Sequence, residues 1–168
     1  MMKFRQQYSL VIGIDPGASG AIALFRPATG NLSVHDMPTV QVARNGRAKR
    51  EVSPSHVAAL LRDQEWLSCQ AYVEQVGAMP GQGVSSMFQF GRSLGIIEGV
   101  LAGLTIPVER ITPQRWRRLL QVREGKDGSR LRAAELMPRH AALFTRKADD
   151  GRAEAALLAY GGAAQLFD

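Results

Sequence analysis

The sequence predicts an α/β fold with a mixed five-stranded sheet, in which three antiparallel strands come first, parallel strands follow, and helices cover both faces. Three short apolar segments, residues 9–15, 20–26 and 32–37, are separated only by turns, as in consecutive hairpins. Two further apolar segments, residues 71–76 and 107–111, alternate with stretches whose apolar residues have helical spacing. Such alternation is typical of parallel strands connected by helices.

Length and composition indicate one globular domain spanning residues 1–168, because 45% hydrophobic residues suffice for a full core. The net charge of +6 favours a polyanionic partner, and a solvated basic surface is the alternative. The single cysteine, Cys69, excludes an internal disulfide and a cysteine-rich zinc site. No signal-peptide core and no apolar run near the roughly 20 residues of a membrane span are present. We therefore expect a cytoplasmic protein with no membrane partner.

The region after the third strand contains a basic stretch and then a helix. Residues 44–50 are rich in Arg and Lys without periodicity, which predicts a mobile loop. Ser53 followed by Pro54 is typical of an N-cap and the first helical position. The helix that follows carries apolar residues at helical spacing, namely Val57, Leu60, Leu61 and Trp66.

A longer helix is expected from a cap at Ser85 or Ser86 to about residue 104. Its apolar side is predicted to contain Phe88, Leu94, Ile97 and Leu101. Glycine recurs every four residues on this helix, although each glycine costs about 1 kcal/mol relative to alanine. We therefore expect this glycine ridge to pack within the chain or against a second copy rather than to contact a ligand. The ridge comprises Gly91, Gly95, Gly99 and Gly103.

Two helices are expected after the fifth strand. Thr112 and Pro113 repeat the pattern of an N-cap followed by proline. Residues 125–128, which begin and end with glycine, interrupt this helix, and residues 129–137 resume it. The residues expected to face the core in the first of these helices are Trp116, Leu119 and Leu120.

The last helix is expected to begin at Asp149 or Asp150 and to end at the glycine pair Gly161 and Gly162. Its acidic start suits the positive end of a helix dipole. Its apolar stripe is formed by Ala153, Leu157 and Tyr160.

Four carboxylates are placed where they could converge. Asp15 and Glu74 each lie in an otherwise apolar strand, where an isolated buried charge costs several kcal/mol unless it is compensated. Asp150 and Glu154 are four residues apart and therefore share one face of the last helix. Hard oxygen ligands of this kind suit Mg²⁺ or Mn²⁺ rather than zinc. Two such ions would activate a water and stabilise the leaving oxygen of a phosphodiester.

Each of these acids also has a simpler interpretation. Asp15 could cap the turn that follows it, as Asp before Pro and Gly often does. Glu74 could be a surface residue at the end of its strand. Asp149 and Asp150 could be an N-cap pair, and Glu154 could be a solvated helix residue.

Basic residues are concentrated between the fifth strand and the last helix. Because Trp116 needs the inner face of its helix, Arg117, Arg118 and Lys126 are free to point at phosphate, and Arg130 is a further candidate. A solvated helix face is the alternative. In the earlier basic stretch, Arg44 and Arg47 are either a second contact to the nucleic-acid backbone or part of a disordered loop.

Three motifs resemble RuvC-type Holliday junction resolvases: residues 13–17 (GIDPG), 73–76 (VEQV) and 150–155 (DGRAEA). Residues 79–88 and 90–93 are most similar to the phage and prophage branch of that family. The resemblance extends from about residue 12 to residue 161, and the order and spacing of the motifs carry it.

The resemblance implies an RNase H-like fold, a homodimer and Mg²⁺-dependent paired nicking of four-way DNA junctions, with Mn²⁺ able to substitute. It further implies a bacterial host cytoplasm and a phage or prophage origin. By position, the metal-binding carboxylates would be Asp15, Glu74, Asp150 and Glu154. Lys126, together with Arg117, would lie close to the scissile phosphate and stabilise charge in the transition state.

Two positions depart from the family pattern. The last pair of acids is four residues apart here and three apart in bacterial members, so Asp149 could take the role of Asp150. Bacterial members also have an aromatic residue three positions after the acid of the fourth strand, where this chain has Gly77. The residues that could replace this wedge are Met79, Met87, Phe88 and Phe90.

Three other functions compete with junction resolution. A nuclease that cuts branched DNA more broadly and a non-catalytic junction-binding module would both use the same fold. A phosphotransferase is the third, since the pattern Asp-x-Gly-x-Ser at residues 15–19 also occurs in actin-like ATPases. Those enzymes need two such domains, for which 168 residues leave no room.

Overall fold

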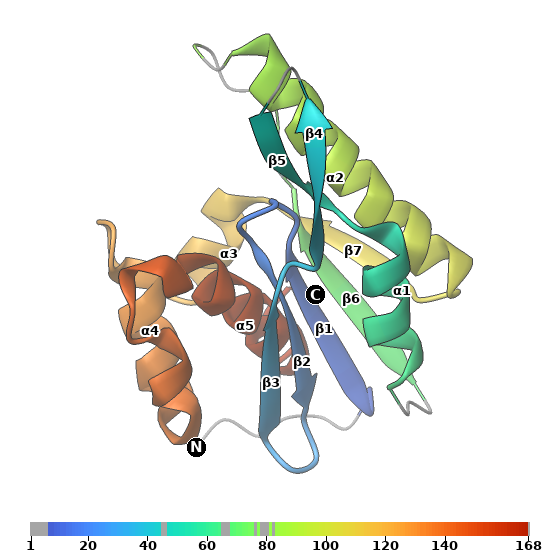
Figure 1. The fold of residues 1–168 in the computed structure, drawn as a ribbon. Helices are drawn as coiled ribbons and strands as arrows, with labels where there is room; N and C mark the ends of the chain where they lie inside the picture. The colour runs from blue at the N-terminus through green and yellow to red at the C-terminus, as the bar shows by residue number, and fades with distance from the viewer. Residues whose placement is uncertain are drawn as a thin grey trace.

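The computed structural model describes residues 7–44, 47–64, 68–75, 77, 81 and 83–167. Its main sheet has five strands in the order β3-β2-β1-β6-β7, and β1 pairs antiparallel with β2 and parallel with β6 (Figure 1). This arrangement confirms the predicted fold class. The strands are β1 (Leu10–Asp15), β2 (Ala21–Arg26), β3 (Asn31–Asp36), β6 (Cys69–Glu74) and β7 (Val108–Ile111).

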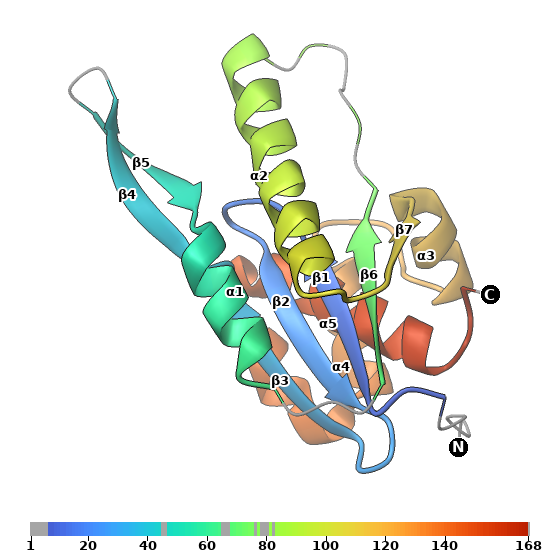
Figure 2. The same ribbon diagram turned by 90° about the vertical axis from the view of Figure 1, so that its right-hand side faces the viewer.

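Helices cover both faces of this sheet (Figure 2). One face packs against α1 (Pro54–Arg62) and α2 (Val84–Gly103). The other packs against α5 (Asp150–Ala163), and α3 (Pro113–Leu119) and α4 (Gly128–Leu136) lie against α5. Because helices cover both faces, β1 and β2 are almost continuously apolar, as doubly covered strands usually are. Two 3₁₀ segments, η1 (Pro138–Phe144) and η2 (Lys147–Asp149), connect α4 to α5.

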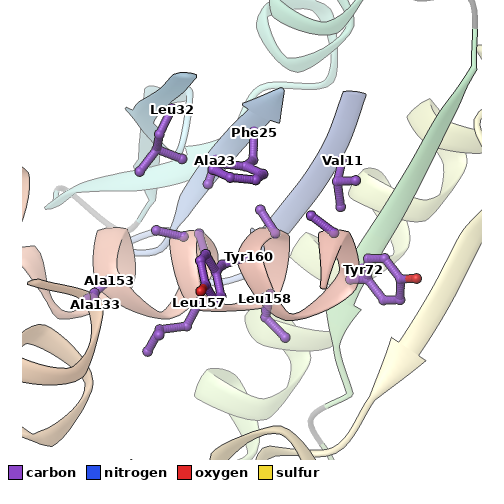
Figure 3. Close-up of a cluster of buried hydrophobic side chains, with 14 of the residues drawn as sticks. Val11, Ala23, Phe25, Leu32, Tyr72, Ala133, Ala153, Leu157, Leu158 and Tyr160 are labelled. Atoms are coloured by element: carbon purple, nitrogen blue, oxygen red, sulfur yellow. The ribbon is translucent and has the colours of Figure 1, made fainter. Parts of the chain in front are cut away.

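The helix α5 lies unusually close to β1. A Cβ atom added to Gly13 would be 2.0 Å from the carbonyl oxygen of Ala155 and 2.4 Å from the nitrogen of Ala159. Alanines on this side of α5 keep the helix backbone near the strand, and larger side chains such as Leu157 and Tyr160 fill the surrounding space (Figure 3). The position of α5 on the sheet is therefore set by backbone contact.

The expected end of the last helix at Gly161 and Gly162 is wrong, because α5 continues to Ala163. These glycines are inside the helix for a packing reason. A Cβ atom on Gly162 would be 2.1 Å from Cε2 of Tyr72, and one on Gly161 would be 2.3 Å from Cζ of Phe167. The rings of Tyr72 and Phe167 occupy the space that the two glycines leave, and they pack edge to face with each other.

The basic stretch at residues 44–50 is not the loop that was expected. It belongs to a second, two-stranded sheet formed by β4 (Thr39–Arg44) and β5 (Arg47–Val52), which we call the arm. The register pairs Arg44 with Arg47, leaving two residues between the strands. These are Asn45 and Gly46, the dipeptide most typical of a tight hairpin turn, although both lie outside the described residues. The arm projects away from the main sheet (Figures 1 and 2).

Two of the predicted helix starts are confirmed. Ser53 caps α1 by accepting a hydrogen bond from the backbone nitrogen of His56, and Thr112 caps α3 in the same way through Arg115. In both helices the residue after the cap is proline. Trp66, predicted on the apolar stripe of the first helix, lies outside the described residues.

The prediction for α2 was partly wrong. Its N-cap is Gly83 rather than Ser85 or Ser86, and no side chain caps it. Ile97 and Leu101 are buried as expected, but Phe88 is 64% exposed. The first turns of α2, which include Phe88, extend beyond the main sheet (Figure 2).

The glycine ridge of α2 is exposed. A Cβ atom added at any of its four positions would meet nothing within 4 Å in the structure. Packing of the ridge within the chain is therefore not seen among the described residues, and packing against a second copy stays a prediction. Within the same described ranges, none of the helices combines the length and the apolar character needed to cross a membrane.

Candidate active site

Asp15 is the last residue of β1 and lies at the start of the turn to β2. Its Oδ1 accepts a hydrogen bond of 3.3 Å from the backbone nitrogen of Gly17, so the turn-capping interpretation holds for part of the carboxylate. A Cβ atom on Gly151 would be 2.9 Å from Asp15 Oδ2. The absence of a side chain at Gly151 therefore allows the first turn of α5 to approach Asp15.

Glu74 ends β6, at the same edge of the sheet as Asp15, because β1 and β6 run parallel. It is only 8% exposed, which excludes the interpretation as a surface residue. The indole Nε1 of Trp116 donates a hydrogen bond of 2.9 Å to Glu74 Oε1. Trp116 was predicted as a core residue, and its role as a donor to Glu74 was missed because a side-chain partner far away in the sequence leaves no local pattern.

Glu154 projects from the second turn of α5 and has two partners. The Oγ of Ser129 donates a hydrogen bond of 3.1 Å to Glu154 Oε1, and Arg117 Nη1 lies 3.5 Å from the same oxygen. Arg117 also donates to Ser129 Oγ at 3.1 Å, and its guanidinium lies 5.4 Å from the ring centroid of Trp116. Ser129 was not singled out in the sequence, where it reads only as the start of a helix.

Asp15, Glu74 and Glu154 influence one another electrostatically. Burial and then the charge of Glu74 raise the pKa of Asp15 to about 6. Burial, followed by the charges of Glu74 and Asp15, raises the pKa of Glu154 to about 7. Burial also raises the pKa of Glu74, against the hydrogen bond from Trp116 and the charge of Arg117. The structure thus brings these three predicted carboxylates from β1, β6 and α5 into one partly buried, electrostatically coupled group, which we call the acidic triad.

Asp150 is held differently from the acidic triad. Its Oδ1 accepts a hydrogen bond of 3.0 Å from Arg130 Nε, and its side chain is 47% exposed. Arg130 also forms an ion pair with Asp127 and donates to the carbonyl of Thr145. Arg130, predicted to bind DNA, therefore has protein partners in this structure, and its contact with DNA stays a prediction.

Asp149 is 1% exposed, and its carboxylate accepts hydrogen bonds from Arg146, three residues earlier. One carboxylate oxygen accepts a hydrogen bond of 2.8 Å from the backbone nitrogen of Arg146, and the other accepts one of 2.8 Å from Arg146 Nη2. Arg152 Nε lies 3.9 Å away. The hydrogen bond from the Arg146 side chain is the main cause of the lowered pKa of Asp149. Its two oxygens are thus occupied within the turn that starts α5.

We expect Asp149→Asn to destabilise the fold by about 2 kcal/mol, because hydrogen bonds to a buried charged group are each worth about 1.5–3 kcal/mol. Since the pKa of Asp149 is lowered by folding, its contribution is present above pH 4 and is lost as the pH falls through the folded value. The loss caused by the substitution should therefore shrink in acid. Chemical denaturation at pH 7 and pH 3 measures it, with the half-exposed Asp150→Asn as the control. Equal, small losses in both variants would contradict this role of Asp149.

The remaining predicted cations lie around the acidic triad at varying distance from it. Arg118 and Lys126 are exposed. In the part of the chain that is described, no contact connects Lys126 to a carboxylate of the triad, and its catalytic role stays a prediction. Arg44 and Arg47 flank the turn at the tip of the arm.

The candidate wedge residues differ in their exposure, and the structure does not single out one of them. Gly77 follows the end of β6 without a side chain, and Met79 lies outside the described residues. Phe88 is exposed, whereas Met87 and Phe90 are half-buried on α2.

Comparison with models of known protein families found no match, and comparison with curated proteins found none either. Among solved structures, RuvC of T. thermophilus in complex with a Holliday junction substrate is similar, with a TM-score of 0.56 and 15% sequence identity over 89% of this chain and 90% of that chain. The chain has the RuvC fold. A second RuvC structure from T. thermophilus gives a TM-score of 0.52 and 16% identity, again over 89% of this chain and 90% of that chain.

On this RuvC fold, the donor chemistry of the acidic triad fits a divalent cation. Carboxylate oxygens are the ligands that Mg²⁺ and Mn²⁺ prefer. Burial and then repulsion between the carboxylates raise the pKa values of Asp15 and Glu154, and a bound cation would offset both effects. As their side chains are placed, no group of three or more His, Cys, Asp or Glu among the described residues could hold a metal ion. Side-chain movement would therefore have to accompany metal binding.

We expect the metal-free protein to lose stability as the pH rises from about 4 to about 7. Folding raises the pKa of Asp15 to about 6 and that of Glu154 to about 7, so the folded state binds more protons in this range and its ionisation is unfavourable. At pH 8, Asp15→Asn should raise the melting temperature of the metal-free protein by a few degrees, because it removes one of these unfavourable charges. Each kcal/mol gained in the free energy of unfolding corresponds to about 2–4 °C.

Mg²⁺ should raise the melting temperature of the wild type at pH 8, and should do so much less for Asp15→Asn. Differential scanning fluorimetry with EDTA or Mg²⁺ measures both effects. A wild-type melting temperature that neither pH nor Mg²⁺ changes would rule out a cation site at the acidic triad.

Proposed function

We propose that this protein is a divalent-metal-dependent endonuclease that resolves four-way DNA junctions by paired nicking. The observation that supports this most strongly is the acidic triad, which lies partly buried at the edge of a sheet with the RuvC fold. The similar structure from T. thermophilus is that of RuvC in complex with a Holliday junction substrate. The resemblance of residues 79–88 and 90–93 to phage and prophage members supports a further part of the proposal, that the protein belongs to that branch and acts in a bacterial cytoplasm.

Asp15, Glu74 and Glu154 would hold Mg²⁺, with Asp150 as the fourth ligand once it is released from Arg130. When bound, two such ions lower the pKa of an attacking water and stabilise the leaving oxygen of the phosphodiester. Trp116 orients Glu74 through its indole nitrogen, and Ser129 with Arg117 orients Glu154. Arg117 is the cation nearest to the triad, so its charge is available to the transferring phosphoryl group.

Cations of two regions would position the DNA backbone around this site. Arg118 and Lys126 lie on the side of α3 and α4, and Arg44 and Arg47 lie on the arm. The net charge of +6 favours binding to phosphates at either place.

Paired nicking of a two-fold symmetric junction requires two active sites, so we propose a homodimer. The exposed glycine ridge of α2 supports this, because a helix without side chains along one line allows close approach of a second helix. The mass of the protein in solution, measured by analytical ultracentrifugation, tests the proposal.

The decisive experiment compares cleavage of a synthetic four-way junction, a replication fork and a plain duplex, each with Mg²⁺ and with Mn²⁺. We expect paired, symmetric nicks in the junction. Equal cutting of the fork would indicate the broader nuclease for branched DNA. Binding of the junction without cleavage in either metal would indicate the non-catalytic module.

A further inference from the structure

A groove of about 430 Å³ lies between the arm and the N-terminal half of α2. Its lining combines two cationic side chains, a half-buried aromatic ring and polar groups. The residues that matter here are Ser19 of the β1–β2 turn, Lys49 and Arg50 of β5, and Gln89 and Phe90 of α2.

Three contacts hold the base of the arm in place beside this groove. Arg92 of α2 forms an ion pair with Glu51, which is only 7% exposed. Arg50 Nη2 donates a hydrogen bond of 3.0 Å to Ser19 Oγ. The backbone nitrogen of Ser53, just after β5, donates to the carbonyl of Pro38, just before β4. The groove is thus formed by the folded chain and does not depend on a ligand.

The groove opens next to the acidic triad. A Cβ atom placed on Gly17 would lie 3.7 Å from Asp15 Oδ1 and 3.8 Å from Cε2 of Phe90. Phe90 and the carboxylate of Asp15 therefore border the same glycine. Ser19, in the turn that follows Asp15, lines the groove as well, so the groove and the triad share the β1–β2 turn.

We propose that this groove binds an unpaired nucleotide of the DNA strand next to the scissile phosphate, an inference that rests on the proposed nuclease function. Cations that track the backbone and an aromatic ring on which a base stacks are the two parts of a typical single-strand site. Phe90 supplies the ring, and Lys49 and Arg50 supply the cations.

The cations are available for this role. Lys49 is exposed, and the structure records no ion pair for it among the residues described. Arg50 uses one nitrogen for Ser19, and a guanidinium has five donors, so others can reach a phosphate. Gln89 can donate to a base edge or a sugar. A groove of about 430 Å³ lies within the size range of small-molecule sites and has room for a single nucleotide.

The test measures binding of a fluorescein-labelled oligothymidine by fluorescence anisotropy in EDTA, at several salt concentrations. Lys49→Ala and Arg50→Ala should each weaken binding about threefold or more and reduce the salt dependence by about 0.7 per lost phosphate contact. Phe90→Leu should weaken binding about fivefold or more with little change in salt dependence, because stacking releases no counterions.

Matched controls come from the same chain. Arg62→Ala removes an exposed arginine from α1, outside the groove, and Val108→Ala shortens an exposed apolar side chain on β7, at the far edge of the main sheet from the arm. Both should bind like the wild type. Lys49 is exposed, so its substitution leaves the fold intact and keeps the test valid if Phe90→Leu proves unstable.

The outcomes separate this inference from the nuclease proposal. If the wild type nicks junctions while Lys49→Ala, Arg50→Ala and Phe90→Leu bind the oligonucleotide like the controls, the groove inference alone is overturned. If the wild type cuts no DNA but the three variants lose affinity and the controls do not, the nuclease proposal fails and the groove stands as a single-strand site. If the wild type binds no oligonucleotide, the groove inference is overturned whatever the cleavage assay gives.

Discussion

Asp15→Asn is expected to lower the rate of junction cleavage about a thousandfold or more while leaving DNA binding intact. Asp15 is the carboxylate that lies between the turn of β1 and the first turn of α5, and the cation it would hold contributes several kcal/mol to the transition state. The amide keeps the shape of the side chain and can still accept the hydrogen bond from Gly17. Because the substitution removes a negative charge close to the scissile phosphate, affinity for the junction should stay the same or rise slightly.

Single-turnover cleavage and electrophoretic mobility shift, both with a labelled four-way junction, measure the two effects. Asp63→Asn is the control, because Asp63 is an exposed acid at the end of α1 and precedes the start of β6, whereas Glu74 lies at the opposite end of that strand. It should cleave at the wild-type rate. Nicking by Asp15→Asn at a comparable rate would remove Asp15 from the active site and with it the proposed use of the triad.

Gly13→Ala is expected to destabilise the fold by about 3 kcal/mol or more, and to reduce the yield of folded protein. The new methyl group would lie 2.0 Å from the carbonyl oxygen of Ala155, which belongs to the backbone of α5 and has no rotamer to change. The helix would have to move away from β1, opening the core on this face of the sheet. Urea denaturation followed by circular dichroism measures the change.

Gly103→Ala adds the same methyl group at the last residue of α2, where it meets nothing within 4 Å. Its free energy of unfolding should equal or exceed that of the wild type by up to about 1 kcal/mol, since alanine is the better helix former. If both variants were equally stable, close contact between β1 and α5 would not be what positions the last helix.

Local features of the fold were predictable from the sequence. Ser53-Pro54 and Thr112-Pro113 mark helix starts because the capping hydroxyl and the backbone N–H that donates to it are only three residues apart. The mixed sheet, with antiparallel strands followed by parallel ones, follows from the alternation of apolar segments. The placement of Asp15 and Glu74 at one edge follows from the parallel pairing of β1 and β6. In the sequence, both acids already share one feature, because each lies in an otherwise apolar segment.

Features that depend on distant partners were not predictable. Gly162 reads as a helix end in the sequence, and only the ring of Tyr72 explains why it is internal. Phe88 reads as a core residue, but the length of α2 beyond the sheet leaves it exposed. Asp149 and Asp150 are neighbours with the same side chain, and their different surroundings come from Arg146 and Arg130. The arm was missed because its many charged residues obscure the alternation of apolar and polar residues that usually indicates a strand.

Trp116 and Arg117 are consecutive residues of a seven-residue helix, yet one holds Glu74 at the end of β6 and the other contacts Glu154 on α5. The spacing between these two acids is therefore governed by a single turn of α3. A shift or rotation of that short helix would displace both carboxylates together, so intermediate arrangements with one acid in place and the other free are disfavoured. Docking of α3 would consequently act as one all-or-none step in assembling the site, and hydrogen exchange of its backbone amides should track the loss of activity on heating.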